Sequence, residues 1–359
     1  MKILYVSPEN TVGLLTMWET IHVNRGNQSK FITMYRSKQN FNDGLCLDLP
    51  FIGTKNKYIN ARNKYYKITR GPMGDQEVRT TKGPYYYPNI VEKIYFPIRD
   101  RIWRPKIESV IKKHNLLDYD IYHFEWGLDI YRNFSFVKRL KKMRKPIIAH
   151  YHGQDLRIRG VLPKMDQMAD LNLTSEIDLM AKYDKLTYLP LPFIFPKKPP
   201  DFDVKKTIKI CHSTTNRYYK GSEIIISACR DLVKNNLNVK FILIENKSHA
   251  EAMKIKKLCD INIDQICNRG GWGYGMNSVE AMSMGLCVAT EINNSVKSVV
   301  GNNPFVNINQ NNLYEVLNNL VKNPNEIQKL KKRAFNWGVD NHDINNVGNK
   351  LYQLYKKIL

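Results

Sequence analysis

The stretch GGWGYGMNSVEAMSMGLCVAT, residues 270–290, predicts a glycine-rich turn that leads into a helix and then into a buried strand. Four glycines stand ahead of a helix expected over 276–284, which Gly285 closes as a C-terminal cap. Glu280 falls in the second helical turn, out of reach of a capping role. Its carboxylate can accept hydrogen bonds from a ribose diol while the helix N-terminus meets phosphates. The alternative is that Glu280 is only an exposed helix residue.

Strand and helix patterns alternate along most of the chain, which predicts an α/β fold with mainly parallel, doubly wound sheets. KILYV (2–6) opens the chain as a strand, and a helix and a second strand follow. The stretch LPLPFIFPKKPPDFD (189–203) contains five prolines and interrupts the alternation. We therefore expect two Rossmann-like domains facing across a cleft, with these bounds: N-terminal domain 1–190, linker 191–206, C-terminal domain 207–340, and a C-terminal helix at 341–359 that packs back on the N-terminal domain.

The charge of the chain indicates an anionic partner. The formal net charge is +23 over 359 residues, of which 43% are hydrophobic, enough for two cores. Residues 55–113 hold 15 basic and 5 acidic side chains, and tyrosines are interleaved with the basic residues between 54 and 88. Such a mixture suits an anionic membrane surface, an anionic glycan or a nucleic acid. We expect a membrane surface to be contacted through residues 54–113 and do not expect nucleic acid.

The compartment is expected to be reducing. The six cysteines form no CxxC pair and mostly lie inside apolar segments, which favours a cytoplasmic protein without structural zinc. No apolar run approaches the roughly 20 residues of a membrane-spanning helix. We expect a cytoplasmic location, with the inner face of the membrane as a peripheral one.

Two turns after strands offer anion sites. In HSTTNRYYKGSE (212–223), Arg217 and Lys220 lie between a strand and the N-terminus of a helix, where cations and backbone dipoles together suit a diphosphate. A pair of solvated loop cations is the alternative. Near the start of the chain, Gly13 follows the first strand and either lets a ligand approach the backbone or belongs to an ordinary turn.

In the N-terminal half, polar side chains follow two expected strands. AHYHGQDLRIRG (149–160) places His152 and Asp155 directly after a strand, and Glu125 ends the strand DIYHFEW (120–126). A histidine and a carboxylate can act as a general base, a sugar ligand or an orienting pair. Each can equally be a structural group at a strand end.

We expect no metal ion. Two Asp-x-Asp triplets occur, but Asp118–Asp120 begins a strand, at the wrong end of its sheet, and Asp201–Asp203 lies in the proline-rich stretch. The motifs HExxH, GxxxxGK[ST] and GxSxG are missing from the sequence, which removes the usual support for a metalloprotease, a P-loop ATPase or an α/β-hydrolase.

The order of these motifs resembles the retaining GT-B glycosyltransferases of family 4. The resemblance rests on HGQDLR (152–157), NRYYKGS (216–222) and the stretch 270–290, and it covers nearly the whole chain. It implies transfer of a sugar from a nucleotide donor to an acceptor hydroxyl, with retention and without a metal. It implies that Arg217 and Lys220 hold the diphosphate, that Glu280 binds the ribose, that His152 lies by the donor sugar and the acceptor, and that Gly13 is the first-loop glycine. We expect His152, Arg217 and Lys220 to be catalytic, and Gly221, Gly273, Tyr274 and Gly275 to be further donor contacts.

Trp272 stands where the family places the first glutamate of its EX7E motif, eight residues ahead of Glu280. That glutamate contacts the donor sugar. Here the backbone N–H groups of Gly273 and Tyr274 are expected to replace it, or Asp264 and Gln265 approach from the preceding strand end. The Trp272 indole can serve as a sugar platform. Glu125 and Asp155 are further candidate contacts to sugar or acceptor, and an inactive paralogue is the remaining alternative.

The expected function is a hexosyltransferase that uses a UDP- or GDP-sugar as donor substrate, with no other cofactor, and a glycan or lipid-linked acceptor. Two alternatives stay open. One is a non-catalytic protein of the same scaffold that binds a glycan or nucleic acid, which the net charge and Trp272 favour. The other is a GT-B epimerase that acts on the sugar nucleotide itself.

Overall fold

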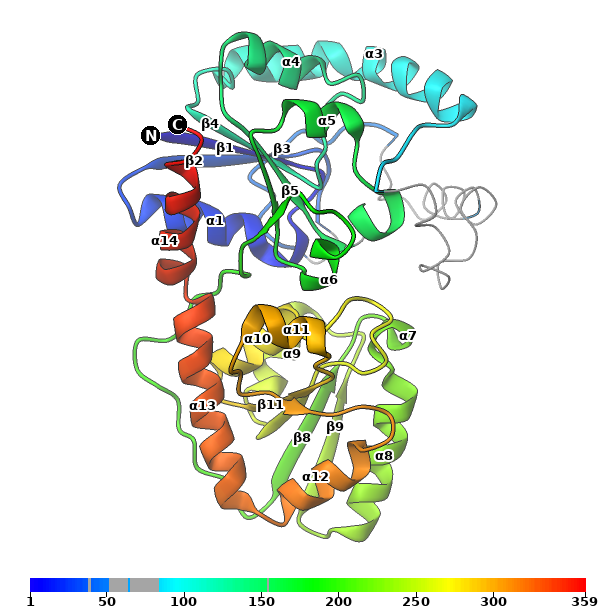
Figure 1. Cartoon of the computed structure of the whole chain (residues 1–359), viewed down its shortest axis with the longest axis vertical. Helices are drawn as coiled ribbons and strands as arrows, with labels where there is room; N and C mark the ends of the chain where they lie inside the picture. Colours follow the sequence, from blue (N-terminus) through cyan, green and yellow to red (C-terminus); the bar gives the residue numbers. More distant parts are fainter. Residues whose placement is uncertain (38–39, 52–63, 65–83, 154) are drawn as a thin grey trace. The chain divides into compact units, whose positions relative to one another are not determined.

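The structure, a computed structural model, describes residues 1–37, 40–51, 64, 84–153 and 155–359 (Figure 1). Most of the basic, tyrosine-rich segment 54–88 lies outside the described residues. The chain divides into two compact units, which are described separately below. Unit 1 comprises Met1–Ser175, Leu179–Leu189 and Lys350–Leu359, and unit 2 comprises Glu176–Asp178 and Pro190–Asn349. No helix among the described residues is long and apolar enough to cross a membrane.

Unit 1 is built on a parallel sheet of seven strands among the described residues, in the order β3-β2-β1-β4-β5-β6-β7. The central pair is in register from Ile3 opposite Ile121 to Val6 opposite Phe124. The strands are β1 (Lys2–Ser7), β2 (Gln28–Thr33), β3 (Leu45–Cys46), β4 (Ile121–Glu125), β5 (Ile147–Tyr151), β6 (Leu171–Thr174) and β7 (Leu186–Tyr188). The predicted parallel α/β fold is thereby confirmed for the first half of the chain.

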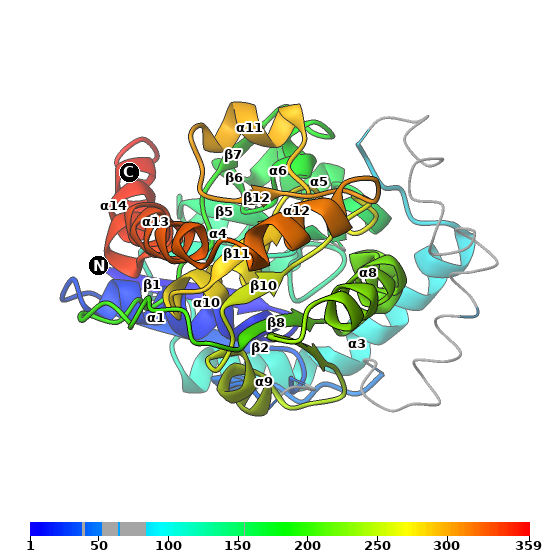
Figure 2. The same ribbon diagram turned by 90° about the horizontal axis from the view of Figure 1, so that it is seen from below.

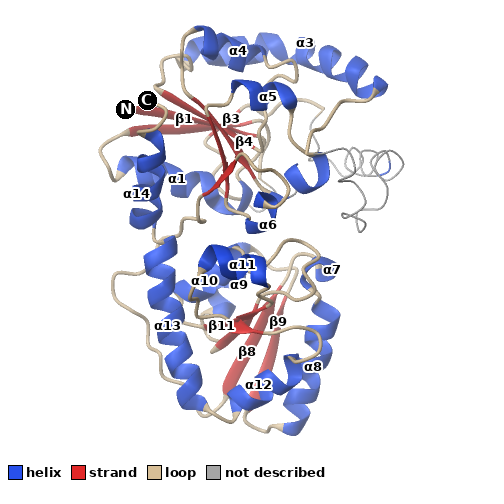
Figure 3. Ribbon diagram, in the orientation of Figure 1, coloured by secondary structure: helices blue, strands red, loops and turns tan. Residues whose placement is uncertain are grey.

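Helices cover both faces of this sheet, with α3 and α4 over one face and α1 along the other (Figure 3). Because side chains alternate along a strand, Leu4 and Phe124 share the core with α3 and α4, while His150 faces Trp18 of α1, at 5.9 Å between ring centroids. The helices and short turns of this part are η1 (Thr11–Gly13), α1 (Leu14–Val23), α3 (Ile90–Lys113), α4 (Ser135–Lys142), η3 (Asp155–Arg159), α5 (Pro163–Met168) and α6 (Ile177–Met180).

Helix α3 (Ile90–Lys113) was not expected from the sequence, where its residues belong to the basic segment. Asn89 caps it, accepting from the Glu92 amide at 2.9 Å, while the Glu92 carboxylate accepts from the Asn89 amide at 3.2 Å. Apolar residues lie on both the buried and the outer face, so the 3.6-residue period that marks an ordinary surface helix is lost.

Helix α4 begins later than its sequence pattern indicates. The run LDIYRNFSFVKRLKKM (128–143) has the pattern of a helix throughout, but the helix starts at Ser135. Phe134 has a left-handed φ of 63°, and the buried Asp129 carboxylate accepts from the amides of Phe136 and Val137, both at 3.2 Å. Asp129 therefore satisfies the first turn of the helix instead of lying inside it.

The last ten residues belong to unit 1 and are fixed by a buried polar network. In α14 (Ile344–Tyr355), the Tyr355 hydroxyl lies 2.6 Å from Nε2 of His123, and the Tyr352 hydroxyl lies 2.9 Å from Nδ1 of His22. Tyr5 joins the network, 2.8 Å from Nε2 of His22. Burial lowers the pKa of His22 to about 3 and holds the pKa of His123 well below its usual range, so both imidazoles of the network are neutral.

Unit 2 is built on a second parallel sheet, of five strands among the described residues, in the order β12-β11-β10-β8-β9. Helices α8 and α12 lie on one side of it, and α9 and α10 on the other (Figure 2). The strands are β8 (Ile208–Ser213), β9 (Val239–Ile244), β10 (Ile261–Ile263), β11 (Cys287–Thr290) and β12 (Val306–Asn307). The helices are α7 (Arg217–Lys220), α8 (Ser222–Asn235), α9 (His249–Lys256), α10 (Met276–Ser283), α11 (Asn294–Val300), α12 (Leu313–Val321) and α13 (Pro324–His342).

Candidate functional site

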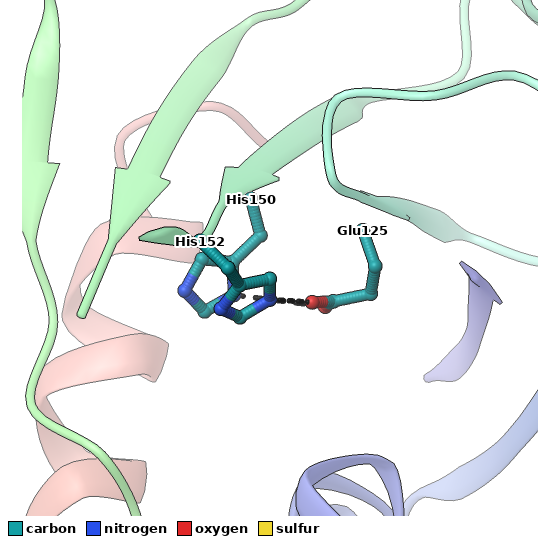
Figure 4. Close-up of side chains that lie close together, drawn as sticks. All are labelled: Glu125, His150 and His152. Atoms are coloured by element: carbon teal, nitrogen blue, oxygen red, sulfur yellow. Dashed lines mark hydrogen bonds and ion pairs between the residues drawn. The ribbon is translucent and has the colours of Figure 1, made fainter. Parts of the chain in front are cut away.

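The first cluster of candidate residues lies in unit 1, where β4 and β5 end side by side. Glu125 pairs with His150 in the register of the two strands, and His152 follows two residues later on the same face. Figure 4 shows the two imidazoles directed at the Glu125 carboxylate. Nε2 of His152 lies 2.5 Å from Oε2 of Glu125, and Nδ1 of His150 lies 3.6 Å from Oε1.

Charge in this cluster is concentrated on Glu125. Burial would raise the pKa of Glu125, but the interactions with His150 and His152 outweigh burial and hold that pKa below its usual range. Burial lowers the pKa of His150, although Glu125 opposes the shift. An ionised Glu125 accepts a hydrogen bond from Nε2–H of His152 and so fixes the orientation of this ring. The side chain of His152 is 18% exposed, whereas that of Glu125 is 3% exposed, so His152 is the member that a ligand can reach.

The same three side chains have the composition of a metal site, since their candidate ligand atoms all lie within 4.8 Å of one another. Two ligands of one zinc ion, each about 2.0–2.2 Å from it in tetrahedral geometry, lie more than about 3 Å apart. The 2.5 Å separation of Glu125 and His152 is that of a direct hydrogen bond. We therefore interpret the cluster as a hydrogen-bonded pair supported by His150.

Asp155 and Gly13 lie near the same end of the sheet in different roles. Asp155 accepts from the His152 amide at 2.8 Å and so fixes the chain after β5. Burial raises the pKa of Asp155 to about 6, although Arg159 and His152 oppose the shift. Gly13 precedes α1 with a φ of 73°, and a Cβ there would come within 3.1 Å of the Phe41 ring. The positive φ favours glycine whether or not a ligand approaches, and a side chain there would also press on the Phe41 ring.

The second cluster lies in unit 2 around the glycine-rich turn 270–275, at the N-terminus of α10. Asp264 follows β10 beneath this turn and is fully buried. Its carboxylate accepts from the Gly275 amide at 3.2 Å, from the Ser278 hydroxyl at 2.6 Å and from Lys220 Nζ at 2.5 Å. Burial would raise the pKa of Asp264, but Lys220 outweighs burial and keeps the carboxyl ionised. The shared carboxylate thus brings the Lys220 ammonium to the start of α10.

Gln265 and Thr290 hold the glycine-rich turn from below. Nε2 of Gln265 donates to the carbonyl oxygens of Gly271 at 3.1 Å and Gly273 at 3.2 Å, and the Thr290 hydroxyl donates to Gly273 at 2.6 Å. Gly273 has a φ of 77°, and a Cβ there would meet Val296 at 2.9 Å. The side chains of Asp264 and Gln265 are therefore used to shape the turn from its buried side.

Arg217 and Gly221 complete the connection between β8 and α8. Arg217 donates to Glu223 at 3.0 Å and to Glu245 at 2.5 Å, with 44% of its side chain exposed. Gly221 ends α7 with a φ of 65°, and a Cβ there would come within 2.6 Å of Ile266. Lys220 and Gly221 thus lie against residues 264–266, which follow β10 and lead into the glycine-rich turn. Arg217 is instead paired with Glu223 and Glu245.

Glu280 lies in the second turn of α10, as predicted, but it is buried and not an exposed helix residue. Its carboxylate accepts from Lys256 Nζ at 2.6 Å and lies 2.8 Å from Nε2 of His249. Burial would raise the pKa of Glu280, but His249 and Lys256 outweigh burial and lower it. The carboxylate is therefore ionised and held in one orientation.

Lys256 and His249 were not found from the sequence. They stand seven residues apart in α9, a spacing that puts both on one face of a helix. This spacing predicts that His249 and Lys256 share a helix face. It does not indicate that they contact Glu280, which lies 24 residues after Lys256.

Trp272 and Tyr274 differ in whether their side chains are available to contact a ligand. The Tyr274 ring packs against Phe305 at 4.7 Å between centroids, and its hydroxyl lies 3.0 Å from His342. Its side chain is thus part of an aromatic cluster, which leaves the backbone as its candidate contact. Trp272 is half-buried in the turn.

The two parallel α/β units define a GT-B fold, as the sequence predicts. No protein-family model matches the chain, and no curated protein matches its sequence. Solved structures do match along its length. An α,α-trehalose-phosphate synthase (UDP-forming) from Burkholderia vietnamiensis superposes with a TM-score of 0.61 at 10% identity, over 99% of this chain and 100% of that one.

Two other solved structures are similar to the same extent. Anabaena Alr3699/HepE in complex with UDP and glucose matches with a TM-score of 0.56 at 12% identity, over 99% of this chain and 100% of that one. A candidate UDP-N-acetylglucosamine 2-epimerase from Listeria monocytogenes matches with a TM-score of 0.56 at 12% identity, over 99% and 96%. At these identities the likeness establishes the fold.

Proposed function

We propose that the protein is a retaining hexosyltransferase that takes a UDP- or GDP-sugar as donor, needs no metal, and transfers the sugar to a glycan or lipid-linked acceptor. The observation that carries the proposal is the meeting of Lys220 and the N-terminus of α10 at Asp264. An ammonium group and the N-terminal end of a helix dipole favour a diphosphate at the same place. The GT-B neighbours, one of them in complex with UDP and glucose, support this reading.

In the proposed complex, Glu280 binds the ribose of the donor. His249 and the Lys256 ammonium together keep Glu280 ionised, and an ionised carboxylate is a strong acceptor for two vicinal hydroxyls. Arg217 and Lys220 would stabilise the charge that develops on the leaving diphosphate. Since Asp264 and Gln265 are occupied beneath the turn, we assign the role of the missing glutamate to the backbone N–H groups of Gly273 and Tyr274, with Trp272 beside the sugar.

Nucleotide binding is expected to depend on Lys220. Calorimetric titration should give a dissociation constant for UDP or GDP that Lys220→Ala raises about tenfold or more, because a hydrogen bond between charged groups is lost. The matched control is Lys234→Ala at the far end of α8, where the side chain is 76% exposed, and this variant should bind as the wild type does. If neither nucleotide binds, or if Lys220→Ala binds as tightly as the wild type, the transferase proposal fails.

The epimerase is a second candidate, favoured by the Listeria structure among the neighbours. The two activities separate cleanly, because an epimerase converts the sugar nucleotide with no acceptor present. Nuclear magnetic resonance of a UDP-sugar incubated with the protein alone would show a second epimer in that case. A protein that binds the nucleotide but neither converts nor transfers the sugar would be the non-catalytic member of the fold that Trp272 allows.

A further inference from the structure

The outer face of α3 carries a continuous apolar stripe. Five aliphatic side chains of this helix are 50–76% exposed: Ile90, Val91, Ile94, Ile98 and Ile102. At about 100° per residue, their spacing confines them to an arc of roughly 120°. Single exposed apolar residues are ordinary, but a stripe along about three turns of one helix indicates a surface that contacts something else.

The helix itself is firmly anchored, so the exposure does not come from a detached segment. Its inner face places Trp103, Ile107 and Ile111 in the core of unit 1, each at most 4% exposed. The buried Asp100 accepts from Arg99 Nη2 at 2.7 Å and from the Arg132 amide at 2.7 Å. The stripe is therefore held outward by a fixed helix, and polar replacements on it leave the core untouched.

Basic residues surround the stripe. The exposed cationic side chains of α3 are Lys93, Arg101, Arg104, Lys106, Lys112 and Lys113, and its exposed acidic residue, Glu108, is paired with Arg139 at 3.2 Å. By the same helical geometry, Arg101 and Lys112 lie within the arc of the isoleucines. The face thus combines apolar side chains with positive charge, the pattern of a helix that lies in a lipid interface.

We propose that α3 docks this face on an anionic phospholipid surface, with the isoleucines at the boundary between headgroups and acyl chains and the cations on the headgroups. A second copy of the chain fits poorly, because the chain carries a net charge of +23 and would bring like charges to the same face. The inference goes beyond the proposed transferase and does not depend on it, since it rests on residues of unit 1 alone.

Co-sedimentation of the full chain with vesicles tests the proposal. The wild type should bind vesicles of equal parts phosphatidylglycerol and phosphatidylcholine, and bind pure phosphatidylcholine at least about tenfold more weakly. The double variant Ile94→Ser/Ile98→Ser should lose about tenfold or more of the anionic binding. Arg101→Glu/Lys112→Glu should also lose binding, and raised salt should weaken the wild type.

The matched control is Leu237→Ser/Leu258→Ser in unit 2, where both leucines are exposed, at 103% and 66%; it should bind vesicles as the wild type does. Equal binding of the Ile94/Ile98 variant and the control would overturn the proposal, as would equal binding to neutral and anionic vesicles. A dimer in analytical ultracentrifugation that the isoleucine substitutions dissolve, without vesicle binding, would assign the face to a second copy instead. UDP titration of the same variants should be unchanged, which separates this outcome from failure of the transferase proposal.

Discussion

Replacing Lys256 with methionine should lower the free energy of unfolding of unit 2 by about 3 kcal/mol or more. The ammonium is 2.6 Å from Glu280 and its side chain is 2% exposed, so methionine leaves a buried carboxylate that has lost its cation. His249 remains as a partner at 2.8 Å, but its side chain is 36% exposed, so it replaces the buried charge only in part. Urea unfolding followed by circular dichroism measures the difference.

The design of this experiment isolates the ion pair. Lys254→Met, at an exposed position in the same helix, controls for the loss of a lysine and should stay within about 0.5 kcal/mol of the wild type. The double variant Lys256→Met/Glu280→Leu removes both charges and should recover much of the stability, because a well-packed apolar pair avoids the cost of burying charge. Equal stability of Lys256→Met and Lys254→Met would show that the pair contributes nothing.

The second large effect is expected at His152. If the protein is a transferase, His152→Ala should lower kcat by about 100-fold or more, while the dissociation constant for UDP should be unchanged because the diphosphate residues belong to unit 2. Glu125→Gln should lower kcat in the same direction, since a neutral amide no longer holds the proton on Nε2 of His152 in place. Radiolabelled sugar transfer under saturating donor gives kcat, and calorimetry gives the dissociation constant.

A conservative variant distinguishes catalysis from a structural role. His152→Gln keeps a donor for the Glu125 carboxylate, which lies 2.5 Å from Nε2, but it cannot carry the proton of an imidazole. Its melting temperature should therefore stay near that of the wild type while kcat remains low. A His152→Gln variant with wild-type kcat would show that His152 only supports the strand end.

The alternation of apolar and polar segments was sufficient to predict the parallel α/β fold, because strands buried on both faces leave a clear apolar run, as in ILYV and IIAHY. It failed at α3, where the stripe Ile90–Ile102 and the core residue Trp103 make the helix apolar on opposite sides. It also failed at the start of α4. There Asp129 ends the loop by a tertiary contact with two amides, which no local pattern reveals.

For the candidate site, the sequence predicted which turns carry the candidate residues, but not which side chains form ion pairs with them. Strand ends and glycines mark where βα turns occur; Lys220 lies in such a connection, and Glu280 lies in the helix that follows another. The sequence could not show that Lys256 would hold Glu280 or that Asp264 would hold Lys220, since those pairs join residues 24 and 44 positions apart. Whether Arg217, Lys220 and His152 bind the donor as the resemblance implies stays a prediction.

The polar network of the C-terminal residues limits which fragments of the protein can fold on their own. An expressed fragment ending at Leu189 would contain the seven described strands of the first sheet but would lack Tyr352 and Tyr355. His22 and His123 would then face water where hydroxyl groups now lie. A stable fragment of this half therefore needs residues 350–359, supplied in trans or fused through a short loop.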